Sequence, residues 1–234
     1  MLTDLRTIYL RHRSAYGWPR EYNPLALPRY WQGNKERPFM SPITPVERSE
    51  LREFEPLFKA VESAMGFVPN SFLTMARWPE MLNAFSGYAS TVMGPGEVAV
   101  ELKQLMAFMV SQAAGCRYCQ AHTAHGALHK GVPKPKIQAI FEFETSALFD
   151  AAERAALRVA LHAGMVPNAT EPEHFSALKV YFTDRQIVEL VAVLALFGSL
   201  NRWNDTMATM LEPEPADFAK STLDHLGWQL GKHA

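Results

Sequence analysis

Residues 101–130, ELKQLMAFMVSQAAGCRYCQAHTAHGALHK, are the stretch that best reveals how this chain folds and what it does. An apolar run is interrupted at Gly115 and is followed at once by the only two cysteines of the chain, Cys116 and Cys119. A Cys-x-x-Cys pair with no other cysteine is either a redox couple or half of a metal site. Three of the eight histidines follow within the same stretch: His122, His125 and His129.

The sequence on both sides of this stretch is patterned for helices, and no segment alternates as a strand does, so the chain is predicted to be all-α. Capping-box patterns are expected at 44–47, with proline at the first helical position, and at 150–153. Thr183 and Gln186 open a long helix, or a pair of helices, through Leu211. A helix is expected from Thr44, which Pro56 interrupts or follows with a second helix ending at Gly66, and the loop at 66–72 is expected to turn into a short helix. Further helices are expected over these ranges: 79–93, 97–114, 116–131, 134–143, 172–181 and 216–226.

Residues 1–44 differ from the rest because they are rich in proline and aromatic residues. We expect an extended arm that lies on the chain's own surface or on a partner subunit, with a poorly ordered leader as the alternative. Residues 45–234 are expected to form a single domain. A shift of 85 residues places CRYC (116–119) over NRWN (201–204), which suggests an internal duplication with halves near 56–143 and 150–226.

The composition excludes several classes of function. The 234 residues are 48% hydrophobic and 20% charged, with a formal net charge of −1, so there is no basic surface for nucleic acid. Polar residues interrupt the apolar runs, which predicts no membrane span, and the charged N-terminus does not resemble a signal peptide. The expected location is the cytoplasm, where a cysteine pair is more often catalytic or metal-binding than a structural disulfide.

The position of the cysteines favours thiolate chemistry. Gly115 predicts a break before a new helix that starts at the pair, and the first turn of a helix stabilises negative charge. Thiols there have a lowered pKa, and the i,i+3 spacing lets one sulfur attack a substrate while the other resolves the product. By this reasoning alone Cys116 would be the more reactive thiol.

His122 follows Cys119 by another i,i+3 step and is the expected base and orienting group. His125 and His129 point away from Cys119 and are expected on a solvated helix face. A zinc ion held by Cys116, Cys119, His122 and His125 is the alternative to a redox pair. Side chains at this uniform spacing spread over half the circumference of a helix, so metal is not expected.

At this point the sequence resembles the alkylhydroperoxidase D-like, carboxymuconolactone decarboxylase superfamily. GCRYCQAHTA (115–124) is similar to its cysteine signature, and GFVPNSF (66–72) resembles its peroxidase-related branch, as does TDRQIVELVAVLALFGSLNRWNDTM (183–207). The resemblance implies helical hairpins assembled as a homo-oligomer. It also implies a thiol peroxidase in which Cys119 attacks the peroxide and Cys116 resolves it, and we follow that assignment.

Two positions depart from the pattern of this superfamily. Its glutamate twelve residues before the first cysteine is Gln104 here, and an amide cannot accept a proton. Glu101 or Glu189 would then have to replace it, and we expect Gln104 and Glu101 to hold His122. The histidine that often follows the second cysteine by four residues is Thr123 here.

The sequence therefore predicts a thiol-dependent hydroperoxide reductase, reduced by an external dithiol or a disulfide reductase. No cofactor, nucleic acid or membrane partner is expected. The alternatives are a lactone decarboxylase that works without the cysteines, a non-catalytic redox-sensing oligomer, and a protein with structural zinc.

Overall fold

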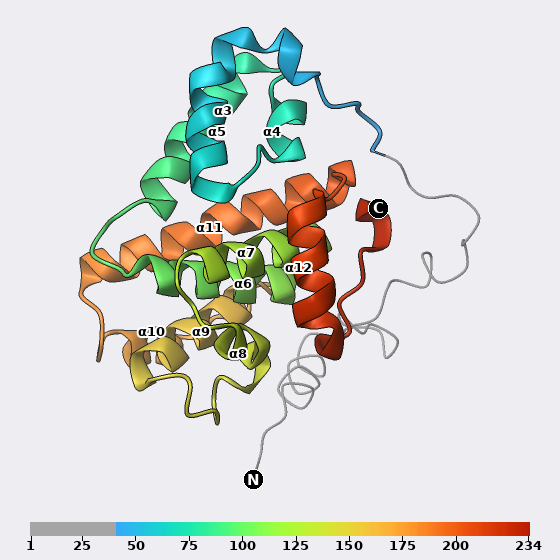
Figure 1. Ribbon diagram of the computed structural model, residues 1–234. Coiled ribbons are helices and arrows are strands. Elements are labelled where there is room, and N and C mark those ends of the chain that lie inside the picture. The colour runs from blue at the N-terminus through green and yellow to red at the C-terminus, as the bar shows by residue number, and fades with distance from the viewer. Residues whose placement is uncertain (1–40) are drawn as a thin grey trace.

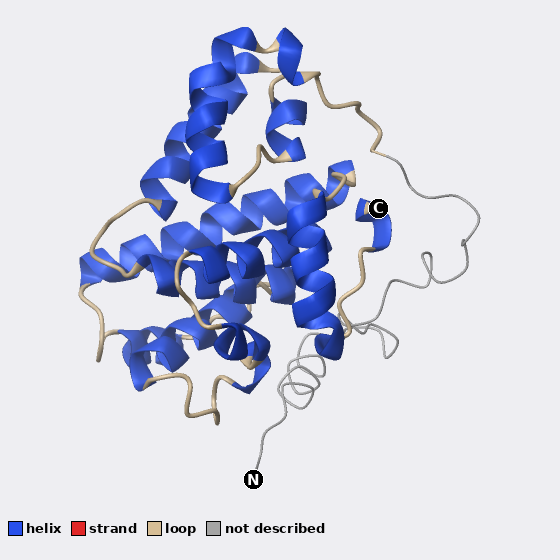
Figure 2. Ribbon diagram, in the orientation of Figure 1, coloured by secondary structure: helices blue, strands red, loops and turns tan. Residues whose placement is uncertain are grey.

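The computed structural model describes residues 41–234, and within that range every regular element is a helix (Figures 1 and 2). The prediction of an all-α fold is confirmed. The expected arm over residues 1–44 lies almost entirely outside the described residues. The α-helices are α3 (Glu55–Met65), α4 (Asn70–Met75), α5 (Pro79–Met93), α6 (Val100–Ala114), α7 (Arg117–His129), α8 (Lys134–Gln138), α9 (Ala151–Ala163), α10 (Pro172–Leu178), α11 (Asp184–Met207) and α12 (Pro213–Leu223).

The helices α6 and α11 form the centre of the molecule. α6 packs against α7, α9 and α11, and ten of its fifteen residues are buried, which explains its apolar run LMAFMV. In Figure 1, α3, α4 and α5 lie on one side of α11, and α9 and α10 lie on the other. The first group encloses a smaller apolar cluster around Phe58 and Leu82.

Of the three helix starts that were predicted from capping residues, two are confirmed. Asp150 caps α9 and Thr183 caps α11, each in a reciprocal capping box. The box predicted at 44–47 is wrong, because Val46 bonds to the carbonyl of Leu73 and only short 3-10 turns follow, η1 (Arg48–Glu50) and η2 (Arg52–Phe54).

The α6 helix begins at Val100, three residues later than predicted. The N–H groups of Glu97 and Val98 donate to the carboxylate of Glu189 on α11, so this segment is held by a side chain instead of helical bonds. Lys103 is fully buried beside it, with Nζ 2.5 Å from Oε1 of Glu189 and bonded to the carbonyls of Val92 and Gly94. Glu189 is therefore part of a structural ion pair.

In the predicted internal duplication, the helix break at Gly115 would have a counterpart 85 residues later in α11. The structure has no break at that position. α6 ends at Gly115, which takes the left-handed conformation with φ of 78°. The equivalent position after the 85-residue shift is Leu200, and a side chain disfavours that conformation. α11 accordingly continues as a single helix to Met207, and then the chain leaves the helix before Leu211.

α11 is also the one described helix that is long and apolar enough to cross a membrane by length and composition, although the sequence predicted no such span. It packs against α5, α6, α7 and α9, as the core helix of a helical bundle does. The helix predicted before Pro56 is replaced by the two 3-10 turns, and the second helix expected at Pro56 is α3. The remaining predicted helices differ from the observed ones only at their ends. The range 134–143 is α8 followed by a 3-10 turn, and the last helix is α12 followed by a 3-10 turn.

Candidate functional site

The cysteine pair lies where α6 ends and α7 begins, inside the main core. Cys116 is the N-cap of α7, and its Sγ accepts the N–H of Cys119 at 3.4 Å. Both side chains are reduced and buried, with exposed fractions of 0% and 2%. The predicted break at Gly115 thus brings both thiols to the first turn of a fresh helix, where free N–H groups favour an anionic sulfur.

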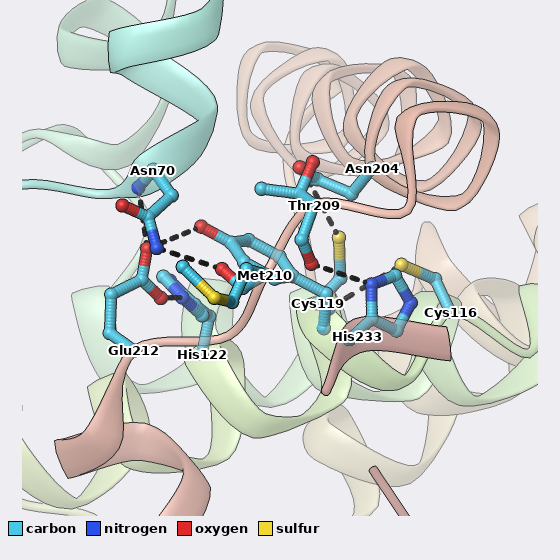
Figure 3. Close-up of polar contacts among 10 residues, drawn as sticks. Asn70, Cys116, Cys119, His122, Asn204, Thr209, Met210, Glu212 and His233 are labelled. Carbon is cyan, nitrogen blue, oxygen red and sulfur yellow. Dashed lines mark hydrogen bonds and ion pairs between the residues drawn. The ribbon is translucent and has the colours of Figure 1, made fainter. Parts of the chain in front are cut away.

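Cys119 has a polar neighbour from α11. Nδ2 of Asn204 lies 3.5 Å from the Cys119 sulfur and donates to it (Figure 3). The other amide atom of Asn204, Oδ1, is buried and has no hydrogen-bond partner among the described residues. Asn204 therefore donates to the Cys119 sulfur with one atom and offers an acceptor near that sulfur with the other.

Cys116 is in a different electrostatic setting. Burial raises the pKa of its thiol well above the ordinary value, and the neighbouring Cys119 raises this pKa further. His233 acts in the opposite direction but does not overcome these two effects. Cys116 is thus a protonated thiol in the reduced pair.

His122 is held by a carboxylate that the sequence analysis missed. Its Nε2 lies 2.5 Å from Oε2 of Glu212, in the loop before α12, and its ring stacks on Tyr118 with centroids 4.2 Å apart. Tyr118 donates its hydroxyl to Oε1 of Glu212 at 2.8 Å, and the N–H of Asn70 donates to the same oxygen. Figure 3 shows this second cluster across α7 from Cys116.

The charges in this cluster are coupled. Burial acts to raise the pKa of Glu212, but His122 and the N–H of Asn70 outweigh it, so the pKa is lowered. For Tyr118, burial and the adjacent Glu212 raise the pKa well above its usual range. The arrangement is an ionised carboxylate that orients an imidazole and a neutral phenol, which suits proton transfer.

His125 and His129 pair with each other, with 3.0 Å between their Nε2 atoms. The ring of His125 lies between those of Phe67 and Phe218. Burial lowers the pKa of His125 to about 4, and the neighbouring His129 and His122 lower it as well. His125 is therefore neutral near pH 7.

The structure does not join the two predicted acid or amide partners to His122. Glu101 is exposed, and within residues 41–234 it makes no side-chain hydrogen bond. The amide of Gln104 faces Gly126 one helical turn beyond His122, where a Cβ would come to 3.0 Å from its Oε1. Among the described residues, the carboxylate that holds the His122 imidazole is that of Glu212, and it replaces the expected contacts from Glu101 and Gln104.

One group in the described part of the chain could hold a metal ion. It consists of Cys116, Asp205 and His233, whose ligand atoms lie within 4.8 Å of one another. It excludes Cys119, His122 and His125, which the zinc alternative required. Asp205 already pairs with Lys232 at 3.1 Å, so a cation occupies one side of this carboxylate.

A cavity of about 840 Å³ opens on the Asp205 side of the site, between α6, α9 and α11. Its walls do not include the cysteines or His122. It is lined by Val110, Ala114, Ala163, Gly164, Met165, Val166, Leu194, Gly198, Asn201, Arg202, Asp205, Thr206 and Lys232.

The fold and the cysteine site together define a helical dithiol protein, and comparison with known proteins agrees. Residues 79–162 match the profile of the carboxymuconolactone decarboxylase family. The chain belongs to this family, in the superfamily that includes the alkylhydroperoxidase D-like proteins, as the sequence resemblance predicted.

Among solved structures, the chain is similar to the debrominase Bmp8. The apo form is 37% identical, with a TM-score of 0.73 over 80% of this chain and 98% of Bmp8. A cysteine-to-alanine variant in complex with 2,3,4-tribromopyrrole is 36% identical, with a TM-score of 0.75 over 81% of this chain and all of that one.

Two further relatives are more distant. An uncharacterized peroxidase-related protein with an alkylhydroperoxidase AhpD core, from Ralstonia eutropha JMP134, is 25% identical, with a TM-score of 0.66 over 76% of this chain and 95% of its own. The uncharacterized protein YdfG of Bacillus subtilis is 23% identical over 103 residues, which are 44% of this chain and 68% of YdfG.

Sequence reasoning missed four residues of this site: Tyr118, Asn204, Glu212 and His233. Asn204 had a signal, because the 85-residue shift aligns it with Cys119, the residue whose sulfur it contacts. Glu212 and His233 had none, since each reaches α7 from a separate segment near the end of the chain.

Proposed function

We propose that this protein is a dithiol-dependent reductase that transfers two electrons from its cysteine pair to a small electrophilic substrate. The observation that carries the proposal is the position of Cys119 between two groups. The amide of Asn204 donates to its sulfur, and the resolving thiol of Cys116 lies close enough to accept the Cys119 N–H. The His122–Glu212 pair, about one helical turn along α7 from Cys119, supplies the proton.

The first candidate reaction is the removal of bromine from an aromatic ring. The Cys119 thiolate attacks the bromine, the carbon–bromine bond breaks, and its electron pair stays on the ring carbon. That carbon takes a proton from the His122–Glu212 pair. The Cys116 thiol then attacks the sulfur of Cys119, bromide leaves and the thiol proton goes to solvent. One substrate and two thiols give the debrominated ring, hydrogen bromide and a disulfide.

Two observations favour this substrate class. Bmp8, 36–37% identical over nearly its whole length, is a debrominase that has been solved with a brominated pyrrole. Oδ1 of Asn204 is a buried acceptor without a partner in the described structure, beside the attacking sulfur, and the N–H of a pyrrole would satisfy it. On the His122 side, the half-buried ring of Phe67 provides apolar contact for a flat molecule.

Hydroperoxide reduction is the second candidate, and it uses the same groups. Cys119 attacks the peroxide, the O–O bond breaks, and the alkoxide takes the proton from the His122–Glu212 pair. The resulting sulfenic acid condenses with Cys116 to a disulfide and water. This candidate is favoured by the similarity to the peroxidase-related protein of Ralstonia eutropha.

Both candidates need an external dithiol or a disulfide reductase to restore the pair, and a reducing compartment such as the cytoplasm suits them. A homo-oligomer stays a prediction from the sequence resemblance. A decarboxylase would keep its activity without cysteines, and a redox sensor would form the disulfide once without turning over.

Steady-state turnover with dithiothreitol tests the proposal, using 2,3,4-tribromopyrrole in one arm and an organic hydroperoxide in the other. We expect bromide release in the first arm and its loss in Cys119→Ser. In Cys116→Ser, we expect at most a single turnover with a modified Cys119, detected by intact mass. Unchanged turnover of either substrate in Cys119→Ser would refute the dithiol mechanism, and turnover of the peroxide alone would select the second candidate.

A further inference from the structure

Cys116 has a charged partner from a distant part of the chain. His233, in the 3-10 turn η5 (Gly231–His233), is only 1% exposed, and its imidazole lies within 4.8 Å of the Cys116 sulfur (Figure 3). Neither the family signature nor the proposed function assigns a role to this residue.

The position of His233 is fixed by three hydrogen bonds to the backbone near α7 and α11. Its Nδ1 lies 2.8 Å from the carbonyl oxygen of Thr209, and its own carbonyl accepts the N–H of Leu211 at 2.9 Å. Five residues earlier, Nε1 of Trp228 donates to the carbonyl of Arg117 at 3.2 Å. Because Nδ1 donates to Thr209, Nε2 is the nitrogen that faces the sulfur and the neighbouring carboxylate.

That carboxylate is Asp205 on α11. Its Oδ1 lies 3.4 Å from Nε2 of His233, and its Oδ2 lies 3.1 Å from Nζ of Lys232. Burial acts to raise the pKa of Asp205, but His233 and Lys232 outweigh it, so the pKa is lowered. Burial acts to lower the pKa of His233, but Asp205 and Cys116 raise it to about 9. His233 is therefore an imidazolium at neutral pH.

We propose that the Asp205–His233 ion pair is the charge partner of Cys116 and stabilises the negative charge that develops on its sulfur when Cys116 reacts. His233 acts here as a positioning and electrostatic residue. Since it is already protonated, it does not remove the thiol proton. In resolution of a sulfenic acid, the departing hydroxide takes that proton and leaves as water, so the step balances.

The proposal also explains an order of events. Five ionisable groups from α7, α11 and the C-terminal η5 segment face the Cys116 thiol or the Asp205–His233 pair. In the reduced state, Cys119 opposes a negative charge on the Cys116 sulfur. Once Cys119 has been oxidised, this opposition disappears while the imidazolium remains. Cys116 would then ionise after Cys119 has reacted. The five groups are Arg117, Cys119, Asp205, Lys232 and His233.

The first experiment measures the ionisation of Cys116 without any substrate, so it does not depend on the proposed function. In Cys119→Ser, the ultraviolet absorbance of the thiolate is titrated with and without His233→Asn, which keeps a donor for Thr209 but removes Nε2. We expect the apparent pKa of Cys116 to rise by about one unit or more, because a cation at this distance shifts a pKa by about 1–3 units. Asp205→Asn should move it in the same direction.

The matched control is His225→Asn, because His225 is exposed and bonds the carbonyl of Gln138 away from the cysteines. It should leave the titration unchanged. Equal titration curves for His233→Asn and its parent would overturn the proposal, and so would a fall in the pKa. Zinc in stoichiometric amount, lost in His233→Asn, would also overturn it, because the cluster would then be a metal site.

The second experiment follows the two steps separately in the otherwise unaltered chain, and it rests on the proposed function. With excess hydroperoxide or brominated pyrrole, His233→Asn should consume the first equivalent at the parental rate but form the disulfide about tenfold more slowly. A sulfenic-acid trap such as dimedone should then label Cys119 in the peroxide arm. Slowing of both steps alike would indicate a structural role and refute the proposal. If neither substrate reacts with the parent, the proposed function fails while the titration still decides the role of His233.

Discussion

Nε2 of His122 and Oε2 of Glu212 lie 2.5 Å apart, although 90 residues separate them in the sequence. The family pattern led us to expect a partner for this histidine on α6, at Gln104 or Glu101. The contact instead comes from the loop that precedes α12, and it also engages Tyr118 and Asn70. Glu212 therefore connects α4, α7 and α12 at the candidate site.

Replacing Glu212 by glutamine should lower turnover of the substrate by about 10²-fold or more, because general acid–base catalysis contributes roughly 10²–10⁴-fold. An amide can still accept the N–H of Asn70, so folding should be retained. Steady-state kinetics as a function of pH measure the effect. Glu101→Gln is the matched control, since Glu101 is exposed, and it should change turnover less than about twofold. Equal effects of the two changes would contradict a role for Glu212.

Asn204→Leu should make Cys119 less reactive, because leucine has a similar size but cannot donate to the sulfur. Losing one hydrogen bond to a charged group costs about 1.5–3 kcal/mol, which corresponds to roughly a tenfold to hundredfold slower alkylation of Cys119 at neutral pH. The assay is alkylation in a Cys116→Ser background. An unchanged rate would show that the Asn204 amide does not support the thiolate.

Lys103→Met should destabilise the protein strongly, because it leaves the carboxylate of Glu189 without its buried cation and with only the exposed Arg185 at 3.9 Å. Breaking a buried ion pair by removing one partner costs about 3–5 kcal/mol. The double variant Lys103→Met with Glu189→Leu should be more stable than the single one. Urea unfolding of the parent, both single variants and the double variant measures the effect, and strict additivity of the two changes would refute the coupling.

The ion pair of His233 should make stability depend on pH. The folded pKa of about 9 is above the ordinary 6.5, so between these values the folded state binds more protons than the unfolded state. The stabilisation is complete below about pH 6.5 and is lost as the pH rises through about 9. The contribution of His233 to the free energy of unfolding is at most about 3 kcal/mol. Denaturant unfolding at several pH values should show this slope in the parent and its loss in His233→Asn. A parent whose stability rises with pH over this window would contradict the assignment.

Local patterns predicted the helices well. The break at Gly115 follows from a glycine after a long apolar run, and the caps at Asp150 and Thr183 follow from side chains that bond within three residues. The misplaced start of α6 has a tertiary cause, since the carboxylate of Glu189 takes the N–H groups of Glu97 and Val98. No pattern within that segment could reveal a hydrogen-bond partner 91 to 92 residues away.

The sequence by itself determined the all-α fold, the family, and the placement of two thiols at the start of a helix, because these depend on short-range periodicity and on residues in one continuous stretch. Tertiary structure alone decided what surrounds the thiols. Three residues reach α7 from distant segments because α11, α12 and η5 pack against it. They are Asn204, Glu212 and His233, which lie 85, 90 and 117 residues after their partners Cys119, His122 and Cys116. Proton transfer and thiol ionisation depend on those contacts, and their distances arise only when the core closes.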